Sequence, residues 1–303
     1  MKEPIKVSVI IPAFNSSACI KSAIDSVLYQ TYPVAEIIVV NNNSTDNTEE
    51  IVLSFGPLLK LLNCEIQGVS NARNLGVVNA TSEFIAFLDS DDVWKENKLE
   101  SQVKIINESE KELSIVGCYA DFMVRGKKIG GSIRSDNDEA ALENFKKLGD
   151  LPCITSSWLL SRSGYLNLGG MDPKVHTAED FEFACKAIAS GFIFQISREY
   201  LIQYNISPGT ITHRNYNEQY FRAQYYRTKY FTNNFDLGYD EFLKTISPFG
   251  RLNIQSKTSK YIRLALVNFA DKNYMLAVLL LFGALILNPS ATVKKALKQL
   301  RWN

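Results

Sequence analysis

The first two hundred residues alternate short runs rich in β-branched residues with stretches whose apolar residues recur at helical spacing. Strand-like runs occur at VSVIIPAF (7–14), EIIVV (36–40) and EFIAFL (83–88). Between the first two, one face of a predicted helix carries Ile20, Ile24, Val27 and Leu28. Strands and helices that alternate in this way build βαβ units, so we expect an α/β fold with a mostly parallel sheet.

The alternation becomes less regular beyond residue 92 and stops near Pro208. The sequence predicts a strand at ITSSWLLS (154–161) and a helix that starts at EDFEFACKAIAS and ends at Gly191. The remaining tail is rich in Tyr, Phe, Lys and Arg and has no long β-branched run. We therefore expect two regions, residues 1–213 and a helical C-terminal region at residues 214–303.

Charge is distributed unevenly between these two regions. Residues 214–303 contain 14 Lys and Arg against 5 Asp and Glu, whereas residues 1–213 contain 19 against 27. An acidic first region is suited to hold a cation, and a basic tail is suited to meet an anionic membrane surface. The alternative is that both sets of charges are solvated faces. We expect no nucleic-acid partner.

Tyr274–Leu287 is a run of fourteen residues whose only polar side-chain group is the tyrosine hydroxyl. As a helix it would span about 21 Å, short of the roughly 30 Å hydrocarbon core of a bilayer. We therefore expect a buried core helix, with an interfacial helix as the alternative. A basic amphipathic segment follows at residues 293–302 and favours the interfacial alternative.

The cysteines and the N-terminus bear on the cellular compartment. The five cysteines are odd in number, widely scattered and never spaced as C-x-x-C, so neither a disulfide framework nor a zinc cluster is indicated. The N-terminal stretch MKEPIKVSVIIPAFN has no long apolar run and no small-residue cleavage site. These features predict a cytoplasmic protein with reduced thiols.

An acidic cluster, Asp89-Ser90-Asp91-Asp92, follows the strand predicted at residues 83–88. In an extended backbone Asp89 and Asp91 face the same way, so two carboxylates would lie side by side at the carboxyl edge of the sheet. Mg²⁺ and Mn²⁺ are commonly held by one or two carboxylates together with substrate phosphates. Ligands of open α/β sheets bind at this edge. The alternative is a polar turn that caps the next helix.

Six motifs in a fixed order carry a resemblance to a known family. They are VSVIIPAFN (7–15), NNNSTDNT (41–48), GVSNARNLG (68–76), FLDSDD (87–92), LGGMD (168–172) and AEDFEF (178–183). In order and spacing they resemble the family 2 glycosyltransferases over roughly residues 5–215. The resemblance implies a GT-A fold, a Rossmann-like mixed sheet flanked by helices. In that fold residues 1–92 would form a nucleotide-binding half and residues 93–213 an acceptor-binding half.

Members of this family are mostly inverting transferases that use a nucleotide-diphosphate sugar and a divalent metal, here Mn²⁺ or Mg²⁺. The resemblance assigns the nucleotide to Pro12, Ala13, Phe14, Asn15, Asn41, Asn42, Arg73, Asp89 and Ser90. Within this set, Arg73 would lie near the base or pyrophosphate and Asp89 near the ribose. The metal would be held by Asp91, with Asp89 as a second candidate.

The resemblance also implies the catalytic groups. Asp180 of the Glu179-Asp180 pair would be the base, because transfer to an alcohol needs a carboxylate within reach of the acceptor hydroxyl. A metal and a guanidinium would stabilise the charge that grows on the departing diphosphate. Trp158 and His176 would lie near the acceptor, although packing and loop roles explain these two residues equally well.

Two positions depart from the family pattern. Where many members have Asp at the start of the second motif, this chain has Asn41, and an amide both donates and accepts hydrogen bonds. Nucleobase preference is therefore less constrained. In a later segment the histidine that ligates the metal in some relatives is replaced by Ser207. His213 is a candidate substitute, although we favour a solvent-exposed loop histidine at that position.

We therefore expect an inverting glycosyltransferase that adds a sugar, with a UDP-sugar as the first expectation, to a hydroxyl of a growing surface glycan. The acceptor would be a lipid-linked oligosaccharide at the cytoplasmic face of the inner membrane. One alternative is a sugar nucleotidyltransferase, although no Gly-rich basic loop follows the first strand. The other is a non-catalytic scaffold that binds glycan or membrane. A NAD-dependent oxidoreductase is least favoured, because no G-x-G-x-x-G follows the first strand.

Overall fold

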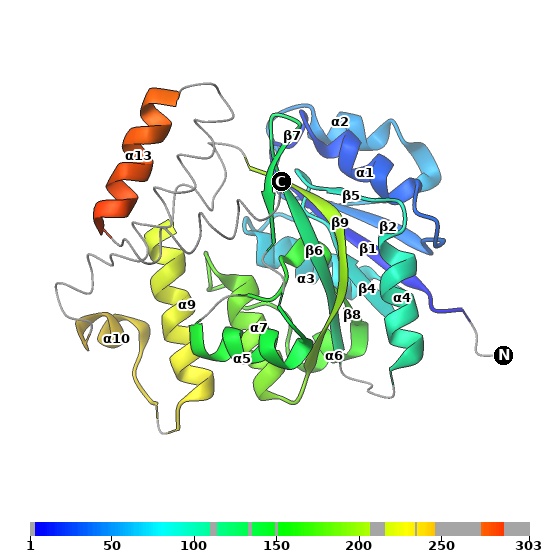
Figure 1. Ribbon diagram of the computed structural model, residues 1–303. Helices are drawn as coiled ribbons and strands as arrows, with labels where there is room; N and C mark the ends of the chain where they lie inside the picture. The colour runs from blue at the N-terminus through cyan, green and yellow to red at the C-terminus, as the bar shows by residue number, and fades with distance from the viewer. Residues whose placement is uncertain are drawn as a thin grey trace. The chain divides into compact units, whose positions relative to one another are not determined.

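The computed structural model describes residues 4–109, 114–132, 135–148, 151–206, 216–233, 235–245 and 274–287. Among these residues nine strands form one mixed sheet, in the order β3-β2-β1-β4-β8-β6-β9-β5, with β7 paired to β6 (Figure 1). Helices flank the sheet. The α/β architecture predicted from the alternating sequence pattern is confirmed, but the expectation of a mostly parallel sheet is wrong, because the later strands pair antiparallel.

The first half of the sheet is parallel and is formed by residues 7–87. Its elements follow one another as strand and helix: β1 (Val7–Ala13), α1 (Ile20–Leu28), β2 (Glu36–Asn41), α2 (Thr48–Leu53), β3 (Lys60–Asn63), α3 (Val69–Asn79) and β4 (Phe84–Phe87). β1 pairs in parallel with both β2 and β4, and all seven of its residues are buried. Continuous burial explains why this strand is an unbroken apolar run.

The second half of the sheet is antiparallel, because β8 pairs in opposite direction with both β4 and β6. Its elements are β5 (Val93–Trp94), α4 (Lys98–Glu108), β6 (Ser114–Val124), β7 (Lys127–Gly131), α5 (Asp138–Leu148), β8 (Leu159–Ser161), α6 (Arg162–Asn167), α7 (Glu179–Ala189) and β9 (Ile193–Asn205). β5 pairs with β9, so the residues that follow β4 are tied to the last strand of the sheet.

The prediction of a strand at residues 154–161 is largely wrong. Only Leu159–Ser161 is a strand, and Thr155–Ser157 form a turn of 3₁₀ helix instead. The hydroxyl of Ser157 donates to the carbonyl of Ile154 at 2.6 Å, and serine hydroxyls that bond nearby backbone compete with strand pairing. The turn releases the side chains of Thr155 and Ser156 for contacts with the site described below.

The chain divides into two compact units, residues 1–121 with 134–204, and residues 122–133 with 205–303. The second unit contains α9 (Tyr216–Phe231), α10 (Tyr239–Thr245) and α13 (Tyr274–Leu287). Tyr225 of α9 packs edge-on against Phe235 and Tyr239, and it also contacts Phe242 of α10. The boundary expected at residue 213 stays a prediction.

The helix α13 spans the same residues as the apolar run, Tyr274–Leu287, but it is not a buried core helix. Ala277 and Ala284 are buried, whereas large side chains are exposed, by 78% at Met275, 63% at Val278 and 60% at Phe282. The expectation of a buried core helix is wrong, because the buried side chains are those of two alanines, whereas these large apolar side chains are exposed. Within the described part of the chain, no helix is long and apolar enough to cross a bilayer.

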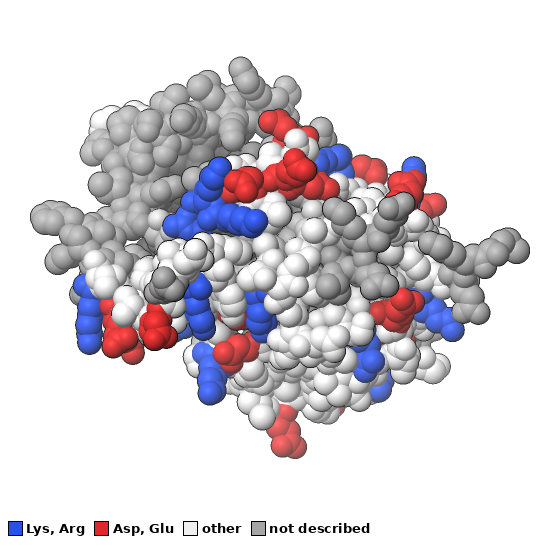
Figure 2. All heavy atoms as spheres, turned by 90° about the horizontal axis from the view of Figure 1, so that it is seen from below, with Lys and Arg blue, Asp and Glu red and all other residues white. Residues whose placement is uncertain are grey.

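Charged side chains of both signs are interspersed on the face of the molecule drawn in Figure 2, with uncharged surface between the groups. Acidic side chains gather near the top of this view, next to a group of basic side chains.

Candidate active site

Two loops at the carboxyl end of the parallel strands are joined into one polar structure. Ala13, the last residue of β1, is in register with Asn41, the last residue of β2, and the Asn42 N–H donates to the Ala13 carbonyl at 2.8 Å. Asn15 lies in the left-handed region, with φ 48°, and its side-chain oxygen accepts from the Thr45 N–H at 2.7 Å. The two loops are therefore fixed relative to each other.

Asn41 and Asn42 are buried, and their amides bind protein groups. Asn42 Nδ2 donates to the carbonyls of Cys64 and Ile66, and its Oδ1 accepts from the Gly68 N–H at 2.7 Å. Asn42 thereby fastens the segment between β3 and α3. The nucleotide-binding residues expected on β1 differ in access: Pro12 and Ala13 are buried, whereas Phe14 is 48% exposed.

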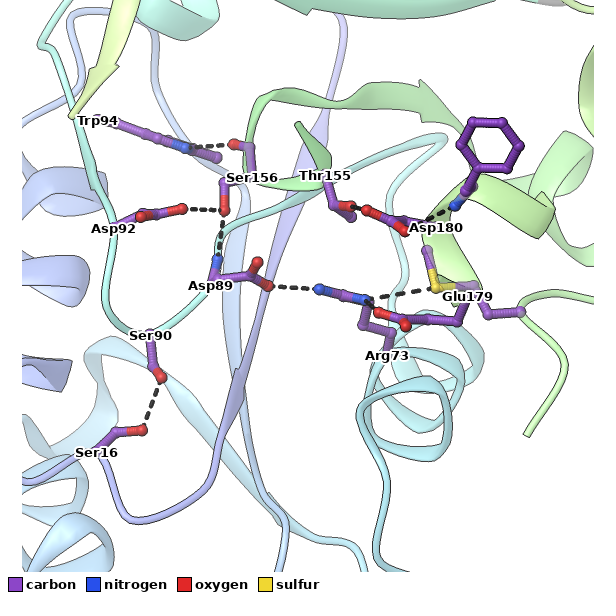
Figure 3. A network of polar contacts seen from close by, with 12 residues as sticks. Ser16, Arg73, Asp89, Ser90, Asp92, Trp94, Thr155, Ser156, Glu179 and Asp180 are labelled. Atoms are coloured by element: carbon purple, nitrogen blue, oxygen red, sulfur yellow. Dashed lines mark hydrogen bonds and ion pairs between the residues drawn. The ribbon is translucent and has the colours of Figure 1, made fainter. Parts of the chain in front are cut away.

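The acidic cluster after β4 is a turn rather than an extension of the strand. β4 ends at Phe87, and the Asp92 N–H donates to the Asp89 carbonyl at 3.0 Å. The expectation of an extended backbone through Asp89 and Asp91 is wrong, because the backbone turns here to enter β5. The hydroxyls of Ser90 and Ser16 share a 2.7 Å hydrogen bond, which ties this turn to the loop after β1 (Figure 3).

A second tie to the turn comes from the 3₁₀ segment at residues 155–157. The Ser156 hydroxyl donates to Asp92 Oδ2 at 2.6 Å and accepts from the Asp89 N–H at 3.1 Å (Figure 3). Asp92 is fully buried, so its carboxylate supports the turn and does not face a ligand. Asp89 and Asp91 are both partly exposed.

Arg73 lies at the centre of the charged part of the site. Its guanidinium donates to Asp89 Oδ1 at 2.6 Å and to Glu179 Oε1 at 2.9 Å, and its side chain is 3% exposed (Figure 3). Burial alone would disfavour the charge, but the two carboxylates raise the pKa of Arg73 above its ordinary value. The guanidinium is thus buried and bound to two acids.

The position of Arg73 depends on the close packing of α3 against the sheet. Gly76 follows one turn later on the same face of α3, and a Cβ atom there would lie 2.5 Å from Ile10 Cγ2 of β1. Glycine removes this clash, so the helix lies directly on the strand and carries Arg73 to its carboxyl end.

Asp91 shows the electrostatic character expected of a cation site. Burial, and next the negative charge of Asp89, raise the pKa of Asp91 to about 6. A divalent cation would remove both penalties, and Mg²⁺ needs only one or two protein carboxylates when substrate phosphates complete its shell. Within the described residues, no group of three or more His, Cys, Asp or Glu is placed to hold a metal.

Glu179 and Asp180 open α7, where Ala178 holds a left-handed conformation with φ 63°. Burial and the charge of Asp180 raise the pKa of Glu179, although Arg73 opposes this. The Asp180 carboxylate accepts from the Thr155 hydroxyl at 3.1 Å (Figure 3). The structure thus brings Arg73, Asp89, Glu179 and Asp180 together from three different elements.

The two residues expected near an acceptor are not part of this cluster. Trp158 is fully buried, packs against Phe183 and Phe194, and donates from Nε1 to the Cys153 carbonyl at 3.0 Å. This burial and these ring contacts support the packing alternative for Trp158. His176 is exposed on the segment that precedes α7. Ser207 and His213 lie outside the described residues.

Thr155 and Ser156 are site residues that the sequence did not single out. They contact Asp180 and Asp92, which are remote in the chain, and the run ITSSWLLS has strand composition. No local sequence pattern indicates such contacts.

The family model for "Glycosyl transferase family 2" matches residues 8–169, more than half of the chain.

The chain belongs to glycosyl transferase family 2. The match ends before Glu179 and Asp180, so the placement of these two acids beside Arg73 comes from the structure alone.

Several curated members of the family are similar to parts of this chain. An uncharacterized glycosyltransferase of Rickettsia felis is 32% identical over 190 residues, which are 60% of this chain and 31% of the relative. The Escherichia coli UDP-Glc:alpha-D-GlcNAc-diphosphoundecaprenol beta-1,3-glucosyltransferase WfgD is 45% identical over 102 residues, 33% of this chain and 40% of WfgD. The chain matches about a third of the length of the first of these relatives.

A longer match is to the putative teichuronic acid biosynthesis glycosyltransferase TuaG of Bacillus subtilis. It is 28% identical over 210 residues, which are 68% of this chain and 81% of TuaG. Among solved structures, S. aureus TarS 1–349 in complex with UDP-GlcNAc has a TM-score of 0.59 at 19% identity. The match covers 87% of this chain and 84% of the TarS chain. This likeness confirms the GT-A fold.

Proposed function

We propose that this family 2 protein is an inverting glycosyltransferase that moves a sugar from a nucleotide-diphosphate donor to a hydroxyl group of a growing surface glycan. The observation that carries the proposal is the convergence of Asp89, Glu179 and Asp180 around Arg73. This cluster lies at the carboxyl end of an open α/β sheet, where such sheets bind their ligands.

In the proposed reaction the acceptor hydroxyl oxygen attacks the anomeric carbon of the donor sugar. Asp180 accepts the hydroxyl proton, the bond from that carbon to the diphosphate breaks, and the configuration inverts because no enzyme nucleophile intervenes. The Thr155 hydroxyl orients the Asp180 carboxylate. Arg73 fixes Glu179, the residue next to the base, by a 2.9 Å ion pair.

Asp91, with Asp89, would hold Mn²⁺ or Mg²⁺, which when bound supplies positive charge to the diphosphate leaving group. Support for this assignment comes from the raised pKa of Asp91, about 6, which reflects burial and the charge of Asp89.

We propose a UDP-sugar as donor and a lipid-linked glycan as acceptor. The names of WfgD and of the TarS complexes refer to UDP-glucose, UDP and UDP-GlcNAc, and the name of WfgD includes a diphosphoundecaprenol acceptor. TuaG is named for teichuronic acid biosynthesis. These names support a place for this chain in surface polysaccharide synthesis.

The proposed place of work is the cytoplasmic face of the inner membrane, which the chain would reach as a peripheral protein. The exposed Met275, Val278 and Phe282 of α13 offer apolar side chains, and residues 214–303 have an excess of basic groups. Flotation with anionic liposomes, comparing the full chain with one cut before Asn273, tests this. Recovery of both proteins from the soluble fraction would contradict membrane docking.

Calorimetric titration with UDP, GDP and dTDP, each with and without Mn²⁺, tests the donor site. We expect Mn²⁺-dependent binding of UDP that Asp91→Asn removes. Asp25→Asn is the matched control, because Asp25 pairs with Lys21 on the surface of α1. Failure of all three nucleotides to bind would contradict the proposed function.

A further inference from the structure

A carboxylate outside the six motif assignments lies beside the ends of β2 and β3. Glu49 is in the first turn of α2 and is partly exposed. Its Oε2 accepts a hydrogen bond from Asn41 Nδ2 at 3.1 Å. Within the described residues its other oxygen, Oε1, accepts no hydrogen bond.

The Asn41 amide is engaged by protein groups, one of which is Glu49. The same Nδ2 group donates to Asn63 Oδ1 at 3.1 Å, so both of its hydrogens are used. Its Oδ1 accepts from the Ser44 N–H at 3.1 Å, and the residue is 5% exposed. An aspartate here could not donate to Glu49, whereas the amide orients the carboxylate.

An exposed aromatic ring lies at the same edge of the sheet. Phe14 directly follows Ala13, which is in register with Asn41, and Asn41 is in turn in register with Asn63 of β3. The loop that carries Phe14 is bonded to the loop that leads into α2, because the Ser16 N–H donates to the Thr48 hydroxyl at 2.7 Å. An aromatic face that stacks and a polar group that reads an edge are the two contacts by which proteins bind nucleobases.

We propose that Glu49, oriented by Asn41, accepts a hydrogen bond from the ring N–H of the donor's nucleobase and so selects donors with such a group. The inference rests on the proposed function and names its donor class. Uracil and thymine present N3–H, and guanine presents N1–H. Cytosine and adenine have a lone pair at the corresponding ring nitrogen, which a carboxylate repels.

The experiment compares UDP with CDP by calorimetry in the presence of Mn²⁺. UDP is expected to bind the wild-type chain at least tenfold more tightly than CDP, since a hydrogen bond to a charged group contributes enough for that ratio. Glu49→Ala is expected to weaken UDP binding about tenfold and to bring the ratio close to one.

Glu49→Gln gives the sharper result. The glutamine oxygen can take the hydrogen bond from Asn41, which leaves its NH₂ group to donate toward the base. That donor matches the N3 lone pair of cytosine, so we expect the preference to shift toward CDP. Glu50→Gln is the matched control, because Glu50 is the neighbouring residue of α2, is exposed, and is expected to leave both affinities unchanged.

Thermal unfolding of each variant shows whether the fold is retained. If the wild-type chain binds UDP and Glu49→Ala keeps the wild-type ratio of UDP to CDP affinity, this inference is wrong while the proposed function stands. Equal binding of UDP and CDP by the wild-type chain would likewise overturn the inference alone. If no nucleotide binds the wild-type chain, the proposed function fails together with the inference.

Discussion

Two polar networks line the carboxyl end of the sheet, and they differ in chemistry. The network after β1 and β2 consists mainly of amides, hydroxyls and backbone groups, with Asn42 making three bonds to the segment 64–68. The network after β4 consists of carboxylates around Arg73. The first is satisfied by hydrogen bonds within the protein, whereas in the second the pKa of Asp91 is raised by burial and by Asp89. The first network holds the two loops together, and the second gathers acidic side chains around one buried guanidinium.

The largest effect is expected from Arg73→Met, which leaves two carboxylates in the charged network without their shared cation. Removing one partner from a buried ion pair typically costs about 3 to 5 kcal/mol. Urea unfolding measures this loss. Arg73→Met combined with Asp89→Asn and Glu179→Gln is expected to recover part of it. A loss below about 1 kcal/mol for the single variant would mean that water screens these charges as it does at a surface.

Gly170→Ala is expected to destabilise the chain by about 2 to 4 kcal/mol, because it combines backbone strain with a clash. Gly170 has φ 69°, and a Cβ atom would lie 2.5 Å from Asn74 Oδ1, which accepts from the Tyr165 hydroxyl. Gly169→Ala is the matched control, since Gly169 has φ 77° but no atom within 4 Å of the added carbon. It is expected to show the strain alone, about 1 to 2 kcal/mol. Equal losses in thermal unfolding would contradict this account.

Asn42→Ala tests the network after β1 and β2 and is expected to cost about 1 to 3 kcal/mol, because it leaves one buried and two part-buried backbone groups without partners. The residues affected are Cys64, Ile66 and Gly68. Since the network contains no titrating group at this residue, the loss should be the same at pH 5 and pH 8 in chemical denaturation. A loss that varies with pH would show that the two networks are coupled.

The smallest effect is expected from Asp91→Asn, which should stabilise the folded chain, whereas the other substitutions destabilise it. The pKa of Asp91 is about 6 in the folded chain against an ordinary 3.8, so its charge disfavours folding at neutral pH. As pH falls from about 6 toward 4, the folded chain takes up the proton first and the wild type gains stability from this group. Asp91→Asn should raise stability at pH 7.5, without metal, by on the order of 1 kcal/mol and should remove this pH dependence. An unchanged pH profile would contradict it.

The fold was predictable where sequence pattern and burial agree. β1, β2 and β4 are apolar runs because both their faces are covered. The runs of apolar and β-branched residues in the sequence predict the ends of these strands to within about one residue. The segment 154–161 was misjudged because its serines bond the backbone and the acidic turn, which a local pattern does not report. The exposure of α13 also escaped prediction, since apolar composition alone does not say what covers a helix.

The site was predictable in its residue types but not in its connections. The acidic cluster after β4 and the pair Glu179-Asp180 were identified from the sequence and the family resemblance, and Asp89 does lie close to Asp91. That Arg73 joins Asp89 to Glu179, which lies 106 positions after Arg73 in the chain, required tertiary structure. The same limit applies to Glu49, whose link to Asn41 crosses from α2 to the end of β2.

The pairing of β5 with β9 has a consequence for the order in which the chain folds during its synthesis. Val93 and Trp94 align with Gln203 and Ile202, so the pairing must wait until roughly 110 further residues have left the ribosome. The parallel strands β1 to β4 are complete long before that and need no partner from beyond residue 87 to pair with one another. The turn that carries Asp89 and Asp91 lies between these two stages. Because distant contacts are the slow ones to form, this turn is expected to reach its final shape among the last parts of the domain. A nascent chain would then bury its first strands early and acquire its acidic turn late.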